Sequence, residues 1–410
     1  MPGAEKSKLQ MRFVNMGQGD FCMIKCPDDK VVVVDCGSMA HLDPQIFETA
    51  QKRLRAWTKG KSVHALILTH PDRDHYSEVP RLFLTHPAVK IETIFFSRLY
   101  DINSPLGHYT IGGLNNAVYS KHFGTPVLRE ITINESTKKS LNWEYQENNN
   151  GYIHHPKEEE IEKNICKVAS GTTKRGTEWS INIVAGNVES NKMVDDKDLD
   201  PNSRSLVTLV QLGNDRALLT GDATPEVQEY LYKVCKKDEQ LNDLLSDLAA
   251  FQIPHHGSDE CAPVEDFLRM VLPDSLVVSV DLLNDRHHLP RYSVINAWIE
   301  EAVFTEQDTY IDYWKDYGEL TTPIESINDI IKEKWEKPGY EVIYNNSRTF
   351  CWLKDPENAG PAKSNTGFYG VTSNSFFLYR MKTKKDIEET GMQEKTKNGT
   401  ADIVIMFTED

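Results

Sequence analysis

The length, composition and charge of the chain already exclude several classes of protein. It has 410 residues, of which 39% are hydrophobic and 26% are charged, and this apolar content argues against global disorder. Lysine and arginine total 46, aspartate and glutamate total 62, and the net charge of −16 argues against a protein that coats polyanions. A nucleic-acid enzyme with a local basic groove is still compatible with this charge.

The cysteines and the N-terminal segment indicate where the protein works. The 7 cysteines are scattered without repeated Cys-x-x-Cys pairs, which is typical of a reducing compartment and not of a disulfide framework. The segment MPGAEKSKLQMRFV lacks the apolar core of a signal peptide, and no stretch approaches the ~18 apolar residues of a membrane span. We therefore expect a cytoplasmic protein with no membrane partner.

The first hundred residues show a regular pattern. Short apolar or alternating runs predict strands over 9–15, 20–26 and 30–37, with the turn sequences MGQG and PDDK between them. A helix is expected over 43–60, with Asp43 as its N-cap, Pro44 at its first position and Gly60 at its end. The buried strand ALILTH (65–70) then leads directly into a polar loop rich in histidine and aspartate.

The rest of the chain predicts an α/β layered protein with two additions. Residues 98–200 are rich in Asn, Glu, Lys and Gly, and we expect most of them to form an insertion over the core. SLVTLVQL and RALLTGDA (205–223) predict a hairpin that turns at 213–215. Helices are expected from Pro225, near 263–271 and over 293–303, and strands over 275–280, 374–381 and 401–410. We expect residues 1–350 to form the main domain and residues 351–410 a C-terminal extension.

The sharpest chemical signal is His70-Pro-Asp72-Arg-Asp74-His75, which places four potential metal ligands within six residues. The strand before it fixes the backbone, and the loop lets the side chains converge on one point. A solvated acidic loop would not need two histidines around two aspartates. This motif therefore predicts a metal site.

Two later strand ends repeat this arrangement. LLTGD ends in Asp222, and FQIPHHGS ends in the histidine pair that begins at His255. Each has a simpler explanation, because Asp222 could cap the helix that begins at Pro225 and His255 could be a buried core histidine with satisfied hydrogen bonds. Three strands that deliver such residues at the same end favour metal binding.

The motifs MGQGD, VVDCG, THPDRDH, NSRSLV, LLTGDA and PHHGS occur in this order and resemble the metallo-β-lactamase superfamily. The chain more closely resembles the soluble hydrolase domain of ComEC-type DNA-uptake proteins. The matching pieces span residues 12–290, interrupted by the stretch 98–200. The resemblance implies a four-layer αββα sandwich with a metal site at the edge between its two sheets.

The resemblance also implies a set of metal ligands. His70 and Asp72 would hold a first metal, Asp74, His75 and His255 a second, and Asp222 would bridge both. Bridged divalent metals lower the pKa of a shared water and stabilise a developing oxyanion, and Asp74 would also orient that water.

Two departures from the superfamily pattern bear on the metal. Asp72 stands where a histidine is commoner, and no histidine matches the additional ligand that usually lies between the loop and Asp222. Oxygen-rich sites favour manganese or magnesium over zinc. We expect one or two divalent ions, with manganese, zinc and magnesium as candidates.

Further residues are expected beside the metals. Asn202, Ser205, His256 and Ser258 are candidates for contact with substrate, and His288, in the sequence His-His-Leu-Pro, for proton donation to a leaving group. Asp20 and Asp35 are expected to hold turns or to support the metal-bound imidazoles.

Two classes of function fit these residues. The first is a metal-dependent hydrolase, a phosphodiesterase or nuclease, for which the ComEC likeness favours DNA and the net charge favours a small or cyclic nucleotide. A lactam or thioester hydrolase is a weaker alternative. The second class is a metal-stabilised, non-enzymatic scaffold in a multi-protein system. In either case a protein partner could bind through residues 98–200 or through the C-terminal extension.

Overall fold

The computed structural model describes most of the first 280 residues and scattered segments beyond them. The described residues are 7–14, 16, 19–39, 44–84, 89–97, 126–135, 137–145, 153–188, 201–271, 273, 275–279, 294, 297–298, 341–344, 351–354, 367–371, 375–380 and 403–409. None of the helices within these ranges is long and apolar enough to cross a bilayer.

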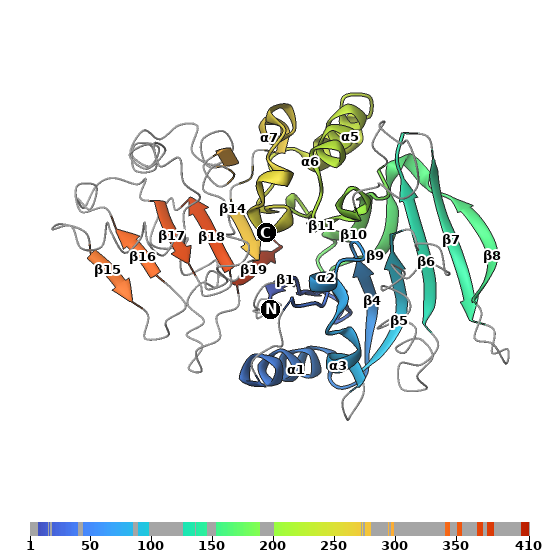
Figure 1. Cartoon of the computed structure of the whole chain (residues 1–410), viewed down its shortest axis with the longest axis horizontal. Helices are drawn as coiled ribbons and strands as arrows, with labels where there is room; N and C mark the ends of the chain where they lie inside the picture. The colour runs from blue at the N-terminus through green and yellow to red at the C-terminus, as the bar shows by residue number, and fades with distance from the viewer. Residues whose placement is uncertain are drawn as a thin grey trace.

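Two large β-sheets form the centre of the molecule (Figure 1). The first has the order β19-β1-β2-β3-β4-β5-β6-β7-β8. Its strands are β1 (Lys8–Phe13), β2 (Cys22–Lys25), β3 (Val31–Val34), β4 (Ser62–Leu68), β5 (Lys90–Phe96), β6 (Val127–Ile133), β7 (Lys138–Tyr145), β8 (Ile153–Glu160) and β19 (Ile403–Thr408).

The second sheet has the order β15-β16-β17-β18-β14-β13-β12-β11-β10-β9. Its strands are β9 (Cys166–Thr172), β10 (Glu178–Ala185), β11 (Val207–Leu212), β12 (Asp215–Leu219), β13 (Ala250–Gln252), β14 (Ser275–Ser279), β15 (Glu341–Tyr344), β16 (Cys351–Lys354), β17 (Gly367–Val371) and β18 (Ser375–Arg380).

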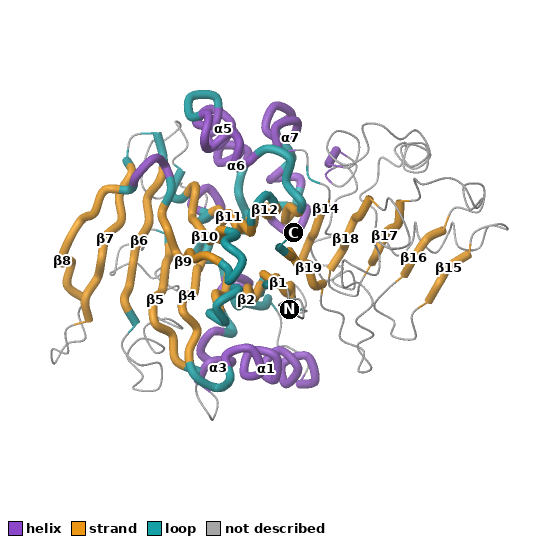
Figure 2. Tube along the Cα trace, turned by 180° about the vertical axis from the view of Figure 1, so that it is seen from behind, coloured by secondary structure: helices purple, strands orange, loops and turns teal. Residues whose placement is uncertain are grey.

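Helices lie on the outer sides of the sheets. Figure 2 shows α1 (Pro44–Thr58) and α3 (Val79–Leu84) on one side of the strands, and α5 (Pro225–Cys235), α6 (Glu239–Leu245) and α7 (Glu265–Val271) on the other. The short helix α2 (Arg73–Tyr76) follows β4. This is the α/β arrangement of two sheets between helices that the sequence predicts.

The run of four valines in β3 explains how one strand serves two cores. Successive side chains of a strand point to opposite faces. Val32 and Val34 belong to the apolar cluster between the sheets, and Val31 and Val33 to the cluster under α1 and α3. Each buried valine contributes about 1.5–3 kcal/mol relative to an exposed one. A continuous apolar run is therefore what this doubly covered strand requires.

Several predicted elements are confirmed at their bounds. The helix expected over 43–60 is α1, and Gly60 after it has a φ of 68°. The expected hairpin pairs β11 with β12, with Leu212 opposite Asp215 and a φ of 57° at Gly213. The helix from Pro225 is α5. Of the helix expected over 293–303, only residues 294, 297 and 298 lie within the described part of the chain.

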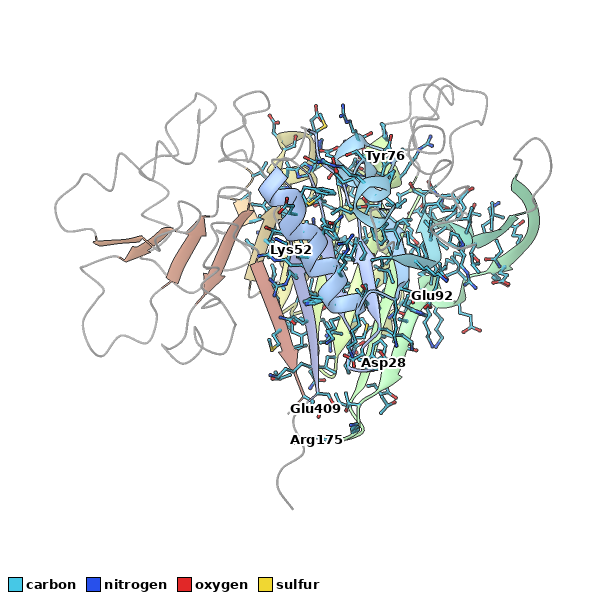
Figure 3. All side chains as sticks on the ribbon, turned by 90° about the horizontal axis from the view of Figure 1, so that it is seen from below. Asp28, Lys52, Tyr76, Glu92, Arg175 and Glu409 are labelled. Carbon is cyan, nitrogen blue, oxygen red and sulfur yellow. The ribbon has the colours of Figure 1, made fainter. Side chains whose placement is uncertain are left out.

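Two regions contribute more to the sheets than the sequence suggests. Within the stretch 98–200, which the sequence predicts to be an insertion over the core, strands β6 to β10 extend both sheets. The C-terminal strands also join the sheets: β18 pairs with β14, and β19 pairs with β1. Glu409 accepts a hydrogen bond from the Ser7 nitrogen (2.8 Å) and pairs with Arg175 (3.5 Å), beside which it lies in Figure 3.

The sheet topology brings the carboxyl ends of several strands together. β3, β4 and β5 run parallel in the first sheet, and β12, β13 and β14 run parallel in the second. Ligand sites of α/β proteins form outside the carboxyl ends of such strands. The histidine- and aspartate-rich motifs follow β4, β12 and β13 and therefore meet at one edge of the sandwich.

Candidate metal centre

Two glycines let the loops of this edge pack backbone against backbone. A Cβ at Gly37 would overlap the backbone of Asp74 and His75, and a Cβ at Gly19 would overlap the backbone of Gly37. The Asp20 nitrogen donates to the Asp74 carbonyl oxygen (3.0 Å). Residues 19–20 thus form one compact unit with the segments DCG and DRDH, and only residues without a side chain fit at these two contacts.

His75 is the most tightly held of the candidate ligands. It is fully buried, and its Nδ1 lies 2.8 Å from Asp35 Oδ2. Asp35 also accepts hydrogen bonds from the Thr69 nitrogen (2.8 Å) and from Thr69 Oγ1 (2.7 Å). The Nδ1 proton of His75 is therefore directed at Asp35, and its Nε2 faces Asp222 Oδ1 at 3.2 Å.

The ring of His70 is oriented by two hydroxyl groups at its Nδ1, as that of His75 is oriented by Asp35. Its Nδ1 lies 3.1 Å from Thr69 Oγ1 and 3.4 Å from Ser205 Oγ. Its Nε2 lies 3.5 Å from Asp222 Oδ2 and 3.7 Å from Asp72 Oδ2. Ser205 Oγ also accepts a hydrogen bond from the Asp222 nitrogen (3.2 Å), so one hydroxyl contacts both candidate ligands.

The two adjacent histidines after β13 lie in a left-handed turn. The φ angles are 49° at His255, 53° at His256 and 77° at Gly257. His256 places Nδ1 2.5 Å from the Ser279 carbonyl oxygen and Nε2 3.1 Å from Asp74 Oδ2. His255 places Nδ1 3.3 Å from Cys261 Sγ and Nε2 3.7 Å from Asp222 Oδ2.

All four imidazoles therefore share one arrangement: a protein group lies at Nδ1, and Nε2 faces a carboxylate. Metal-bound histidines in proteins are oriented in this way. Zn–N bonds of ~2.1 Å at a tetrahedral angle would put two neighbouring donor atoms roughly 3.4 Å apart. The observed separations of 3.1–3.7 Å between Nε2 and carboxylate oxygen agree with that spacing.

Three atoms of the cluster show that these residues fit a cation. His70 Nε2, His75 Nε2 and Asp222 Oδ1 are buried, and apart from the contacts between these imidazoles and the carboxylates of Asp72 and Asp222 they have no hydrogen-bond partner among the described residues. Such atoms are costly to bury unless another group satisfies them. A divalent ion among these atoms would satisfy all three at once, so the donor set fits a metal centre.

Asp20 and His256 belong to the same buried cluster. Suitable donor atoms of Asp20, His75, Asp222 and His256 lie within 4.8 Å of one another, and all four residues are buried. Asp20 Oδ2 accepts a hydrogen bond from Gln252 Nε2 (2.9 Å). The sequence predicts that Asp20 holds a turn or supports a metal-bound imidazole, and that His256 contacts substrate. The signal that could have placed Asp20 here is its position in MGQGD.

The carboxylates and imidazoles shift one another's pKa values. Burial would raise the pKa of Asp222, but its histidine neighbours, His75 first, hold it well below the usual range. Burial likewise acts against the ionised form of Asp74, yet the hydrogen bond from His256 lowers its pKa to about 2.

The histidines shift in the opposite direction. Burial lowers the pKa of His70 and of His256, and the carboxylates, Asp222 first, outweigh it and raise the two values to about 9 and about 10. Protons on these rings therefore compete with a metal ion for the same carboxylates.

The centre opens to solvent on one side. The exposed fractions of the Asp72, His255 and Asp74 side chains are 43%, 19% and 13%, whereas His70 and His75 are fully buried. Structural zinc sites are closed, and catalytic sites keep an open position. The exposure of Asp72 and His255 marks the open side of this centre.

Three of the other predicted site residues, Asn202, Ser205 and Ser258, are buried. Ser205 is fully buried behind His70 and Asp222, and its contact with substrate stays a prediction. The carbonyl oxygen of Asn202 accepts the Ser205 nitrogen (3.0 Å), and Ser258 Oγ accepts the Glu260 nitrogen (3.3 Å). His288 lies outside the described residues.

The sequence model of the metallo-beta-lactamase superfamily matches residues 16–93. No curated protein sequence matches the chain significantly. The short form of human tRNase Z is 11% identical, with a TM-score of 0.32 and coverage of 59% of this chain and 76% of that one.

Two bacterial structures give similar values. The metallo-beta-lactamase fold protein YhfI from Bacillus subtilis is 10% identical, with a TM-score of 0.29 and coverage of 60% of this chain and 70% of that one. CmlA, a diiron beta-hydroxylase from Streptomyces venezuelae, is 12% identical, with a TM-score of 0.33 and coverage of 67% of this chain and 44% of that one. Likenesses at these scores carry no argument about activity.

The sequence match covers those residues of the candidate centre that come first in the chain. Residues 16–93 include Asp20, Asp35 and the whole loop from His70 to His75. The parallel strands and the loop after β4 that carry these residues are present in the structure. This match supports the metallo-β-lactamase superfamily as the family that the chain resembles.

Proposed function

We propose that this protein is a metal-dependent hydrolase, and that its substrates are phosphodiesters. One observation carries the proposal: a buried cluster of carboxylates and imidazoles, with unsatisfied donor atoms, is open to solvent at Asp72 and His255. A metal that only stabilised the fold would not need this opening. The match to the superfamily over residues 16–93 supports hydrolysis as the reaction class.

The donor set supports a phosphate-containing substrate. Asp72, Asp74 and Asp222 provide carboxylate oxygens beside the four imidazoles. Carboxylate oxygens suit manganese or magnesium, the ions common at phosphate-processing centres, and the imidazoles also suit zinc. A bound divalent ion supplies Lewis-acid polarisation of a phosphoryl oxygen and lowers the pKa of a water. One or two such ions fit the donors present.

The residues of the chain have separate roles in this proposal. His70, His75, Asp222 and the histidine pair after β13 hold the metal, together with Asp72 and Asp74. Asp74 is ionised at neutral pH because its pKa is about 2, and it orients the attacking water by accepting one of its hydrogens. Ser205 orients His70 and the Asp222 loop through its hydroxyl group.

Other groups are proposed to contact substrate. Asn202 and Ser258 are candidates for hydrogen bonds to phosphoryl oxygens, and His288 for proton donation to the leaving group. His256 is assigned to the metal instead, because its Nε2 lies 3.1 Å from Asp74 Oδ2. We retain DNA and small or cyclic nucleotides as the two candidate substrate classes. The likeness of the six motifs to ComEC-type hydrolase domains favours DNA, and the net charge of −16 favours a small nucleotide.

A substrate screen tests the proposal. Linear DNA, RNA, cyclic nucleotides and a chromogenic phosphodiester would each be incubated with the protein and Mn²⁺, Mg²⁺ or Zn²⁺. Asp74→Ala is the inactive control. Asp28→Ala is the matched surface control, because Asp28 pairs with Lys30 on the turn between β2 and β3. Hydrolysis by the parent and by Asp28→Ala, but not by Asp74→Ala, is the expected result.

The screen also decides between the two classes of function. A protein that binds divalent metal but hydrolyses none of these substrates with any of the three ions would refute the phosphodiesterase. That result would favour the metal-stabilised scaffold, with residues 98–200 or the C-terminal extension as the partner-binding region.

A further inference from the structure

We propose that the adjacent residues His255 and His256 serve two different metal positions, one on each side of Asp222. His255 joins His70 and Asp72 at the first position, where the sequence lacks a histidine that the superfamily usually provides. His256 joins His75 and Asp74 at the second. The inference deepens the proposed function, since it assumes the same metal centre.

The two oxygens of Asp222 separate the imidazoles into these groups. Oδ1 lies 3.2 Å from His75 Nε2. Oδ2 lies 3.5 Å from His70 Nε2 and 3.7 Å from His255 Nε2. His255 is therefore on the His70 side of the carboxylate. The family resemblance instead implies a place beside His75, at the second metal.

His256 lies on the other side of the centre. Its Nε2 is 3.1 Å from Asp74 Oδ2, and its ring centroid is 5.5 Å from that of His75. The ring of His70 also adjoins that of His75, with 4.1 Å between centroids. His75 and Asp222 thus occupy the middle of the centre, and the histidine pair contributes one ring to each side.

The left-handed turn produces this division. Both histidines have positive φ, a conformation that non-glycine residues seldom adopt and that clusters at functional sites when it is retained. It separates the two ring centroids by 6.3 Å and tilts their planes by 64°. It also buries His256 and leaves His255 partly exposed. The unfavourable backbone thus places two neighbouring rings at two positions.

Cys261 positions His255 without being a ligand. Its Sγ lies 3.3 Å from His255 Nδ1 and 3.5 Å from the Asp222 carbonyl oxygen. The thiol hydrogen is directed at the carbonyl, and the sulfur accepts the Nδ1 hydrogen of His255. This leaves His255 Nε2 as the free nitrogen that faces Asp222. Cys261 thus orients the ring of His255 through Nδ1, as Asp35 orients the ring of His75.

The assignment of His255 and His256 to two metal positions is tested by counting bound ions. Mn²⁺ titration, followed by calorimetry and electron paramagnetic resonance, should show two ions in the parent. His255→Ala and His256→Ala should each weaken one ion at least ~10-fold, while the double variant weakens both. His64→Ala is the matched control, because His64 is a partly exposed histidine paired with Glu92. It should bind Mn²⁺ like the parent.

Combination with Asp72→Ala identifies which ion each histidine holds. His255→Ala combined with Asp72→Ala should still retain the second ion at parental affinity. His256→Ala combined with Asp72→Ala should weaken both ions. The opposite pattern, or a parent that binds a single ion at saturating Mn²⁺, would overturn the inference. Circular dichroism checks folding, and His255→Gln and His256→Gln replace any alanine variant that fails to fold.

The role of Cys261 has its own readout. Cys261→Ala should weaken the His255-dependent ion ~10-fold and leave the other unchanged, whereas Cys261→Ser should restore part of the loss. With Co²⁺ as the probe, the parent should show no thiolate-to-metal absorption band. Such a band, or loss of the other ion in Cys261→Ala, would overturn the positioning role. These measurements need no substrate, so the division can hold even where the phosphodiesterase proposal fails.

Discussion

A substitution at Asp35 tests whether metal affinity depends on the residues that hydrogen-bond to the ligands. Its buried carboxylate accepts three hydrogen bonds, two from Thr69 and one from His75 Nδ1. In Asp35→Asn, one oxygen can still accept the Thr69 nitrogen, but the new amide group faces the Nδ1 hydrogen of His75. His75 must then move or carry its proton on Nε2, and in either case Nε2 no longer faces Asp222 as a free donor.

The expected magnitude follows from the type of contact. Loss of the group that orients a metal-bound imidazole costs ~10–100-fold in metal affinity, or about 1.4–2.8 kcal/mol. The substitution should not strain the backbone, because asparagine tolerates the φ of 56° found at position 35. Asp35→Ala is a poorer test, since it leaves three buried donors at about 1–3 kcal/mol each, against a total stability of about 5–15 kcal/mol.

The assay is competition for Mn²⁺ between the protein and a chelator, with circular dichroism to confirm the fold. We expect Asp35→Asn to remain folded and to bind at least one ion ~10–100-fold more weakly. Asp29→Asn is the control, because Asp29 is an exposed aspartate with a positive φ of 68° that pairs with Lys25 and Lys59. Parental Mn²⁺ affinity in Asp35→Asn would refute the argument that Asp35 orients His75.

Three further predictions concern activity, metal choice and pH. Asp74→Ala should lower turnover of a chromogenic phosphodiester ~10³-fold or more with an unchanged fold, and retained activity would place the chemistry elsewhere. Asp72→His should shift the activity ratio toward Zn²⁺ over Mn²⁺, because imidazole is the softer donor; an unchanged ratio would show that Asp72 is not a ligand. The pKa values of His70 and His256, about 9 and about 10, lie above the ordinary value of 6.5, because carboxylates, Asp222 first, outweigh burial. The stability that these protonated rings contribute is complete below pH ~6.5 and is lost as pH rises through 9–10. Thermal unfolding in a chelator should therefore show a melting temperature that falls between pH 7 and 10, and saturating Mn²⁺ should remove most of this fall; a flat profile in the chelator would contradict it.

Much of the fold could be predicted from local sequence. The valine run of β3, the proline and glycine that bound α1 and the hairpin between β11 and β12 all follow from short-range chemistry. Strands β6 to β10 were harder, because their pairing joins distant segments. Strand β8, for example, contains Pro156 and a run of glutamates, both unfavourable in strands, and is tolerated at the edge of its sheet.

The candidate centre shows the same division between local and long-range information. The motifs located the strand ends that carry His70, Asp222 and His255, because carboxyl ends of parallel strands meet at one edge. They gave Asp20 only a structural or supporting role; it reaches the centre through backbone contacts between two glycine-containing loops. Nor did they predict the side of Asp222 on which each of the paired histidines lies, since a positive φ at a non-glycine residue has no clear sequence signal.

The groups behind the imidazoles predict that the two metal positions differ in affinity. His75 has the charged carboxylate of Asp35 at Nδ1, whereas His70 has hydroxyl groups and His255 a thiol. A carboxylate at Nδ1 raises the basicity of the ligand more than a neutral group does. The second position also has the more buried carboxylate, since the side chain of Asp74 is 13% exposed and that of Asp72 is 43% exposed.

The second position should therefore fill first in a stepwise titration with Mn²⁺. Asp74→Ala should weaken the tighter of the two binding events, and Asp72→Ala should weaken only the other. Both variants remove one aspartate from the same loop, so each serves as the matched control for the other. If Asp72→Ala instead weakens the tighter event, then the buried carboxylate behind His75 does not decide the order of binding, and the exposed side of the centre holds the stronger site.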